Sequence, residues 1–213
     1  MCAFGEDIVE PEKPRGVENR RGLGLLGGMG PDFEFERDAY ARGFSRVAGV
    51  DEVGRGPLAG PVTAAAVVLD PERIPDGLND SKKLSKKARE RLYEEIMQVA
   101  DVSIAHASVA EIEELNILRA SDLAMVRALD GLKQPADFAL VDGNMLPRDL
   151  KIKAQTLIKG DARSQSISAA SIMAKICRDC VMLSLAQQHP GYGWETNMGY
   201  GSKRHIEALR NLG

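Results

Sequence analysis

The feature that most constrains this chain is a pair of short apolar runs, each of which stops at an acidic residue. Residues 47–50 are followed by Asp51 and Glu52, and residues 138–141 are followed by Asp142. Short apolar runs that end in turn-forming residues are typical of buried strands. Because segments with helical spacing separate these strands, the sequence predicts an α/β fold: a mixed central sheet flanked by helices.

Hydrophobic periodicity predicts the remaining elements of the domain. Further strands are expected at 63–69, 102–107 and 156–158, and helices at 85–99, 109–115, 117–132, 164–189 and 203–212. Residues 190–202, rich in glycine and aromatic residues, predict a loop.

Residues 1–43 differ from the rest, since they mix proline, glycine and both charge signs without a sustained period. We expect a flexible N-terminal arm there and a folded domain over residues 44–213. The glycine motif at 22–27 follows no strand-like segment, so we interpret it as a linker rather than a dinucleotide site.

Composition limits the location of the protein. No apolar run approaches the roughly 20 residues that cross a bilayer, and the N-terminus does not resemble a secretory signal. With three cysteines in all, we expect a reducing, cytoplasmic location rather than a disulfide framework. Cys177 and Cys180 lie in an apolar helical pattern with no second pair and no histidine nearby in sequence, which favours buried small side chains over a zinc or redox site.

The net charge of −3 falls entirely within residues 1–43, which leaves the remaining domain neutral. A neutral domain still binds a polyanion if its basic groups share one face and cations offset an acidic site.

Acidic residues at strand ends suggest such a site. Asp51 with Glu52, Asp142, and Asp161 each follow an apolar strand, and strand ends in an α/β sheet open into the ligand-binding crevice. Converging carboxylates repel one another and require cations; oxygen ligands alone suit Mg²⁺ or Mn²⁺. Two ions about 3.5–4 Å apart would suit phosphodiester hydrolysis. Each aspartate alone could equally be a turn former, and Asp161 a helix cap.

Adjacent strand residues point to opposite faces, so Asp51 and Glu52 reach one metal cluster only if the strand bulges or ends there. Alternatively, Glu52 would contribute its backbone carbonyl. Asp51 is the safer ligand.

Several segments resemble one known family in order along the chain. Residues 50–61 match its signature, and residues 79–85, 141–144, 159–161, 167–175 and 178–179 continue the match, with Tyr200 and His205 in its later part. Over residues 46–213 the chain resembles bacterial ribonuclease HII.

The resemblance implies an RNase H-like fold and a four-carboxylate site at Asp51, Glu52, Asp142 and Asp161, holding Mg²⁺ or Mn²⁺. It implies a monomeric endonuclease of RNA–DNA hybrids and of ribonucleotide-containing duplex DNA. Such enzymes cut 5′ of ribonucleotides, single embedded ones included, and leave 3′-hydroxyl and 5′-phosphate ends.

The resemblance also implies substrate contacts. Gly54, Arg55 and Gly56 would read the ribose 2′-hydroxyl, since glycines let the backbone approach closely, and Tyr200 would pack against the neighbouring deoxyribose. Lys82, Lys83 and Lys175 are expected to contact phosphates. For Lys82 and Lys83 a solvated helix entrance is the alternative.

The fourth metal ligand has a second candidate in the sequence. Asp179 could replace Asp161 in that role, or pair with Lys175 on one helix face. His205 is interpreted as a surface helix residue rather than a catalytic base.

The C-terminus bears on whether the chain is catalytic. Because the chain ends at Gly213, before the basic segment usual in the family, a hybrid-binding protein with weak or no catalysis is a second hypothesis. A DNA-only nuclease of the same fold is a third, which the Gly-Arg-Gly turn argues against.

Overall fold

The computed structural model describes residues 30–213, which are built around a five-stranded sheet with the order β3-β2-β1-β4-β5. The strands are β1 (Val47–Val53), β2 (Val62–Val68), β3 (Asp101–Ala107), β4 (Phe138–Asp142) and β5 (Lys153–Leu157). β1, β2 and β3 pair antiparallel, whereas β4 runs parallel to both β1 and β5. The predicted mixed sheet is confirmed.

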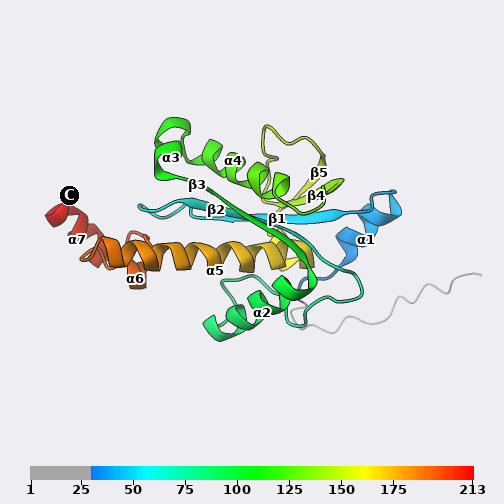
Figure 1. Cartoon of the computed structure of the whole chain (residues 1–213), viewed down its shortest axis with the longest axis horizontal. Helices are drawn as coiled ribbons and strands as arrows, with labels where there is room; N and C mark the ends of the chain where they lie inside the picture. The colour runs from blue at the N-terminus through cyan, green and yellow to red at the C-terminus, as the bar shows by residue number, and fades with distance from the viewer. Residues whose placement is uncertain (1–29) are drawn as a thin grey trace, which may run out of the picture.

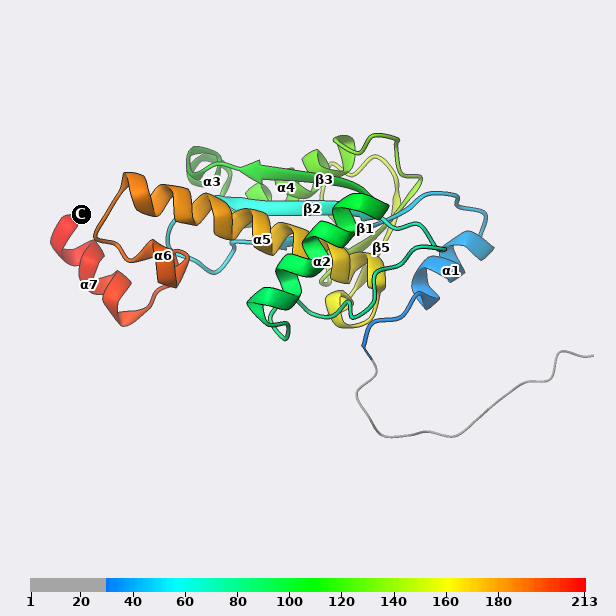
Figure 2. The same ribbon diagram turned by 60° about the horizontal axis from the view of Figure 1, so that its bottom comes forward.

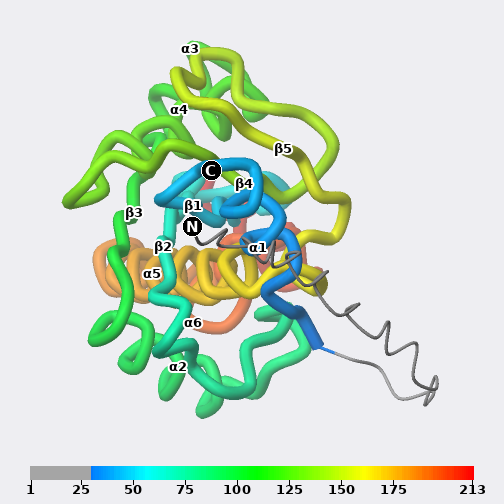
Figure 3. Tube along the Cα trace, turned by 90° about the vertical axis from the view of Figure 1, so that its right-hand side faces the viewer, coloured from blue at the N-terminus to red at the C-terminus, as the bar shows by residue number. Residues whose placement is uncertain are grey.

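Helices cover both faces of this sheet (Figure 1). The covering helices are α3 (Val109–Leu115) and α4 (Ile117–Asp130) on one face, with α2 (Lys86–Val99) and the long α5 (Gln165–Gln188) on the other. Figure 3 views this layering end-on, with α5 directly beneath the strands and α2 outside it. The short α6 (Trp194–Asn197) and α7 (Lys203–Leu212) lie at the far end of α5 (Figure 2).

Small residues let α5 approach the sheet closely. Its buried face includes Ala169, Ala170 and Ala174, which pack against Ala65 and neighbouring apolar residues of β2 and α2. A Cβ added at Gly49 would overlap the backbone of α5 at Ser166, so only glycine fits there. The inner strand β2 is buried along its whole length, as a strand covered on both faces requires.

The prediction of a flexible arm up to residue 43 is wrong for residues 34–41, which form a packed helix. Helix α1 (Glu34–Ala41) packs against β1 and β4, and Phe33 and Ala39 are buried. The helix is short and polar overall, so tertiary contacts rather than periodicity stabilise it. The glycine motif at 22–27 lies outside the described residues.

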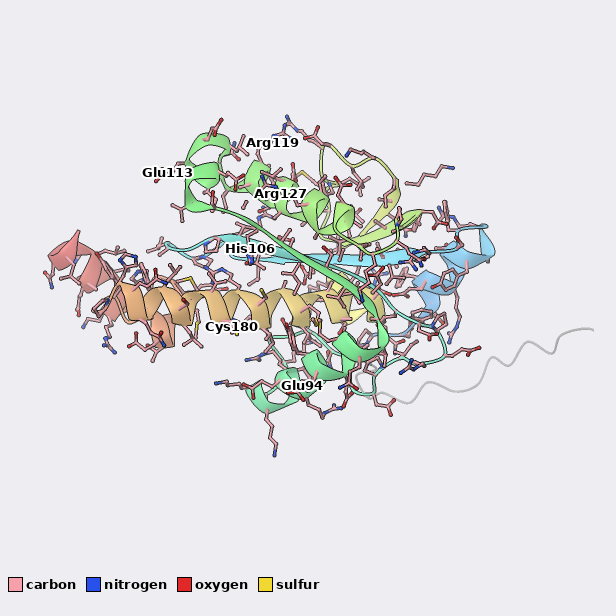
Figure 4. All side chains as sticks on the ribbon, in the orientation of Figure 1. Glu94, His106, Glu113, Arg119, Arg127 and Cys180 are labelled. Atoms are coloured by element: carbon pink, nitrogen blue, oxygen red, sulfur yellow. The ribbon has the colours of Figure 1, made fainter. Side chains whose placement is uncertain are left out.

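Most predicted elements are present, although β5 begins at Lys153, earlier than expected. The interpretation of the cysteine pair needs correction. Cys180 is exposed, and the Cys177 sulfur lies 3.9 Å from Nε2 of His106 on β3. Figure 4 places His106 in the strand layer and Cys180 on α5. Across residues 30–213, no helix is long and apolar enough to cross a membrane.

Candidate active site

The four acidic side chains predicted to form a site line one cavity of about 470 Å³. The carboxylates come from Asp51, Glu52, Asp142 and Asp161. The remaining cavity-lining residues are Val53, Ser81, Lys82, Ser171, Lys175 and Tyr200.

Strand register brings two of these carboxylates together. In the parallel pair of β1 and β4, Val50 lies opposite Val141, so the residues that follow them, Asp51 and Asp142, emerge side by side. Asp161 arrives from η1 (Gly160–Ala162), the turn that follows β5. The backbone N–H of Gly160 donates to Oδ1 of Asp142 at 2.7 Å, which fixes this turn beside β4.

Asp51 and Glu52 reach the cavity together without a bulge, because β1 extends beyond β4. Glu52 stays in ladder register with Ala64 of β2, while the pairing of β1 with β4 ends at Val50. The edge of β1 that would face β4 is therefore open at Glu52, and side chains from both faces meet the cavity there. Nη1 of Arg55 lies 3.3 Å from Oε1 of Glu52.

Burial and mutual repulsion make this site electrostatically costly without a cation. Burial raises the pKa of Asp51 well above its ordinary value, and the charges of Glu52 and Asp142 raise it further. Burial also raises the pKa of Asp161, reinforced by the nearby charges of Asp80 and Asp142 and opposed by that of Lys82. The pKa of Glu52 is raised by burial, which outweighs the opposing effect of Arg55. A divalent cation would relieve all three shifts at once.

The donor set fits a hard cation, since the acidic groups offer oxygen alone. Among residues 30–213, no three or more histidine, cysteine, aspartate or glutamate side chains lie close enough together to hold a metal ion as they stand. The four carboxylates share one cavity, but their side chains would have to move closer together to coordinate the same ions.

A buried arginine joins the two loops that flank the cavity. Arg178 on α5 donates to the carbonyls of Pro61 and Met198 at 2.9 Å and of Ala59 at 3.0 Å. The first loop follows the Gly-Arg-Gly turn, and the second leads to Tyr200. Gly54 in this turn has φ of +110°, a conformation that favours glycine.

The Gly-Arg-Gly turn lies against Tyr200, which lines the cavity. A Cβ placed on Gly56 would come 3.7 Å from the Tyr200 ring, and the backbone N–H of Leu58 donates to the Gly199 carbonyl at 2.8 Å. Gly56, Arg55 and Tyr200 are exposed. This exposed surface adjoins the cavity through Tyr200, which lines it.

The predicted lysines divide into two groups. Lys82 and Lys175 line the cavity, whereas the exposed Lys83 is not among its lining residues. Nζ of Lys175 pairs with Oδ1 of Asp179 at 2.8 Å. Asp179 does not line the cavity, so its role in the structure is this ion pair.

Sequence reasoning missed three residues near the carboxylates. The hydroxyls of Ser81 and Ser171 are 2.8 Å apart in the cavity wall, and the charge of Asp80 acts on Asp161. All three belong to segments that resemble the family, but only tertiary contacts bring the loop at 79–83 to α5.

The interpretation of His205 as a surface residue is wrong. The side chain is fully buried: Nε2 accepts from Nε1–H of Trp194 at 2.9 Å, and Nδ1 lies 2.9 Å from the Tyr200 carbonyl. His205 therefore supports the segment that carries Tyr200.

Comparison with known proteins decides the family. A family model described as Ribonuclease HII matches residues 48–213. The chain belongs to the ribonuclease HII family. Ribonuclease HII of Roseobacter denitrificans is 68% identical over 173 residues, covering 81% of this chain and 87% of that protein. Ribonuclease HII of Cereibacter sphaeroides is 62% identical over 183 residues, or 86% of each chain. As a ribonuclease HII family member, the chain is a ribonuclease H, an endonuclease that acts on RNA–DNA hybrids.

Solved structures agree on the fold. The ribonuclease H2 of Pyrococcus horikoshii OT3 superimposes with a TM-score of 0.67 at 31% identity, covering 78% of this chain and 86% of that one. Bst-RNase HIII, solved in complex with Mn²⁺, shares the fold with a TM-score of 0.62 at 20% identity, covering 81% and 72% of the two chains. The expected RNase H-like fold is confirmed.

Proposed function

We propose that this ribonuclease H cuts on the 5′ side of ribonucleotides, including single ones embedded in duplex DNA, and leaves 3′-hydroxyl and 5′-phosphate ends. The observation that carries the proposal is the carboxylate cavity with the Gly-Arg-Gly turn and Tyr200 at its rim. A turn that leaves room for a ribose, next to an acidic site that would act on the phosphate, is suited to recognising the 2′-hydroxyl of RNA.

In this proposal Asp51, Glu52, Asp142 and Asp161 hold two Mg²⁺ or Mn²⁺ ions. Support comes from their shared cavity, their oxygen-only chemistry and the raised pKa of Asp51 and Asp161. The bound ions would supply an activated water and neutralise charge at the scissile phosphate. The carboxylates keep their place through the sheet register and the hydrogen bond from Gly160 to Asp142.

The remaining residues would bind and orient the duplex. Backbone groups of Gly54 and Gly56 would approach the 2′-hydroxyl, Gly56 from an exposed position and Gly54 from a buried one. Arg55 would contact the same nucleotide, and Tyr200 would pack against the next sugar. Lys82, Lys83 and Lys175 would contact phosphates on either side of the cut. We also propose that the enzyme works as a monomer in the cytoplasm.

A cleavage assay on a labelled duplex with one ribonucleotide tests the proposal. With Mg²⁺, the native chain should cut 5′ of the ribonucleotide, and Asp142→Asn should lose at least about 100-fold in rate because it removes a charged ligand. Asp149→Asn is the matched control: this exposed aspartate follows the same strand but does not line the cavity. Cleavage by Asp142→Asn at the rate of the control, or equal cutting of an all-DNA duplex, would refute the proposal.

A further inference from the structure

A fully buried glutamate outside the family match holds the start of α5. Oε1 of Glu36, on α1, accepts from the Ser164 hydroxyl at 2.6 Å and from the backbone N–H of Ser166 at 2.9 Å. Both serines are fully buried. The family match begins at residue 48, so Glu36 precedes it.

The main chain at Asp32, four residues before Glu36, also hydrogen-bonds to the start of α5. The N–H of Asp32 donates to the Arg163 carbonyl at 3.1 Å, and the N–H of Gln165 donates to the Asp32 carbonyl at 2.9 Å. Residues 32–36 therefore clamp residues 163–166 through side-chain and main-chain hydrogen bonds alike. This clamp begins two residues after Asp161.

Hydrogen bonds continue from the clamp into the carboxylate cavity. The backbone N–H of Ser164 donates to the Gly160 carbonyl at 2.8 Å. The N–H of Gly160 in turn donates to Oδ1 of Asp142 at 2.7 Å. The path Glu36–Ser164–Gly160–Asp142 thus runs beneath the turn that carries Asp161.

The cost of burying Glu36 favours a specific role. Its second carboxylate oxygen, Oε2, is buried and has no hydrogen-bond partner within residues 30–213. A buried polar atom without a partner costs stability, although the N-terminus of the 24-residue helix α5 favours a carboxylate. An apolar residue would fill the space without this cost, but it would not hold Ser164 and Ser166.

We propose that Glu36 is a positioning residue for the carboxylate site: it fixes the Gly160–Ala162 turn and so sets Asp161 and Asp142 for metal binding. The inference rests on the proposed role of these carboxylates as metal ligands. Helix α1, which precedes the residues matched by the family model, would then help to set the geometry of the active site.

Calorimetric titration with Mn²⁺ tests this without substrate. Partners that orient metal ligands typically contribute about 10–100-fold in affinity, so Glu36→Ala should bind Mn²⁺ about tenfold more weakly than the native chain. Excess Mn²⁺ should recover its kcat, which loss of folded protein would not allow. Glu36→Gln keeps an acceptor and should recover most of the affinity. Glu34→Ala, on the exposed side of α1, is the matched control and should bind as the native chain does.

Circular dichroism at the titration temperature establishes that each variant is folded. If Glu36→Ala does not fold, Ser164→Ala removes the bond to Glu36 together with the cap on the Ile167 N–H, and it should weaken Mn²⁺ binding in the same direction, to a smaller extent. Folded Glu36→Ala with native Mn²⁺ affinity would overturn the inference alone. Native binding that survives Asp142→Asn would instead overturn the proposed metal site, and the inference with it.

Discussion

Replacing Arg178 should destabilise the domain more than any exposed substitution, because its guanidinium is fully buried and bonded to three backbone carbonyls. These belong to Ala59, Pro61 and Met198, at 2.9–3.0 Å. In Arg178→Met the volume is largely retained, but all three carbonyls lose their donor. The loops carrying the Gly-Arg-Gly turn and Tyr200 would then be held together less tightly, although the bond from Leu58 to Gly199 would remain.

The magnitude follows from the three orphaned acceptors. Each buried carbonyl left without a donor costs about 1–3 kcal/mol, and some recover a partner when water enters the loops, so we expect a loss of roughly 3–6 kcal/mol in the free energy of unfolding. Since whole domains are stable by only about 5–15 kcal/mol, this is a large fraction. In Arg178→Lys the ammonium group remains as a charged donor, so the loss in the free energy of unfolding should be smaller.

Urea unfolding followed by circular dichroism measures the loss directly. Arg204→Met is the control: its side chain is 69% exposed and 3.8 Å from Glu195, so its loss should stay under about 0.5 kcal/mol. The KM for the duplex should rise in Arg178→Lys. A free energy of unfolding for Arg178→Met within about 1 kcal/mol of the native value would refute the reasoning.

Three further results are expected. Because the pKa of Asp51 is raised by burial and by Glu52, its carboxyl binds a proton more tightly in the folded protein without metal than in the unfolded chain, so Asp51 lowers stability as pH rises above about 4. In urea titrations with chelator, Asp51→Asn should therefore be more stable than the native chain at pH 7; equal stability would contradict this. Gly54→Ala should destabilise the fold, since φ is +110° and the new Cβ would lie 2.6 Å from the Pro61 carbonyl oxygen, whereas Gly56→Ala should fold normally yet cleave poorly in the duplex assay. The hydrogen bond from Arg127, and to a lesser extent those from Ser108, lower the pKa of Glu111 from 4.5 to about 2. The stabilisation that the Glu111 carboxylate provides is therefore lost as pH falls through that range, and thermal melts of Glu111→Gln should lack this acid-dependent loss.

Local sequence predicted the strands of the site because their apolar runs are short and end at acidic residues. The parallel register of β1 and β4 then places Asp51 beside Asp142. What local sequence could not predict was that β1 would extend past β4, which lets Glu52 share the cavity without a bulge.

Residues held by distant contacts were missed for the same physical reason. Helix α1 is polar overall. Its stability depends on Glu36, which bonds to Ser164 more than a hundred residues away, and on Ala39, which packs against β1 and β4. His205 shows no sign of burial in its own helix, since Trp194 and the Tyr200 carbonyl define its environment. Asp80 approaches Asp161 only through the folding of a loop.

The most direct test of the central claim is anomalous diffraction from crystals soaked in Mn²⁺ with an uncleavable ribonucleotide-containing duplex. We predict two peaks about 3.5–4 Å apart between Asp51, Asp142 and Asp161, with the ribonucleotide against the Gly-Arg-Gly turn. Peaks elsewhere on the molecule, with none among these carboxylates, would contradict the account.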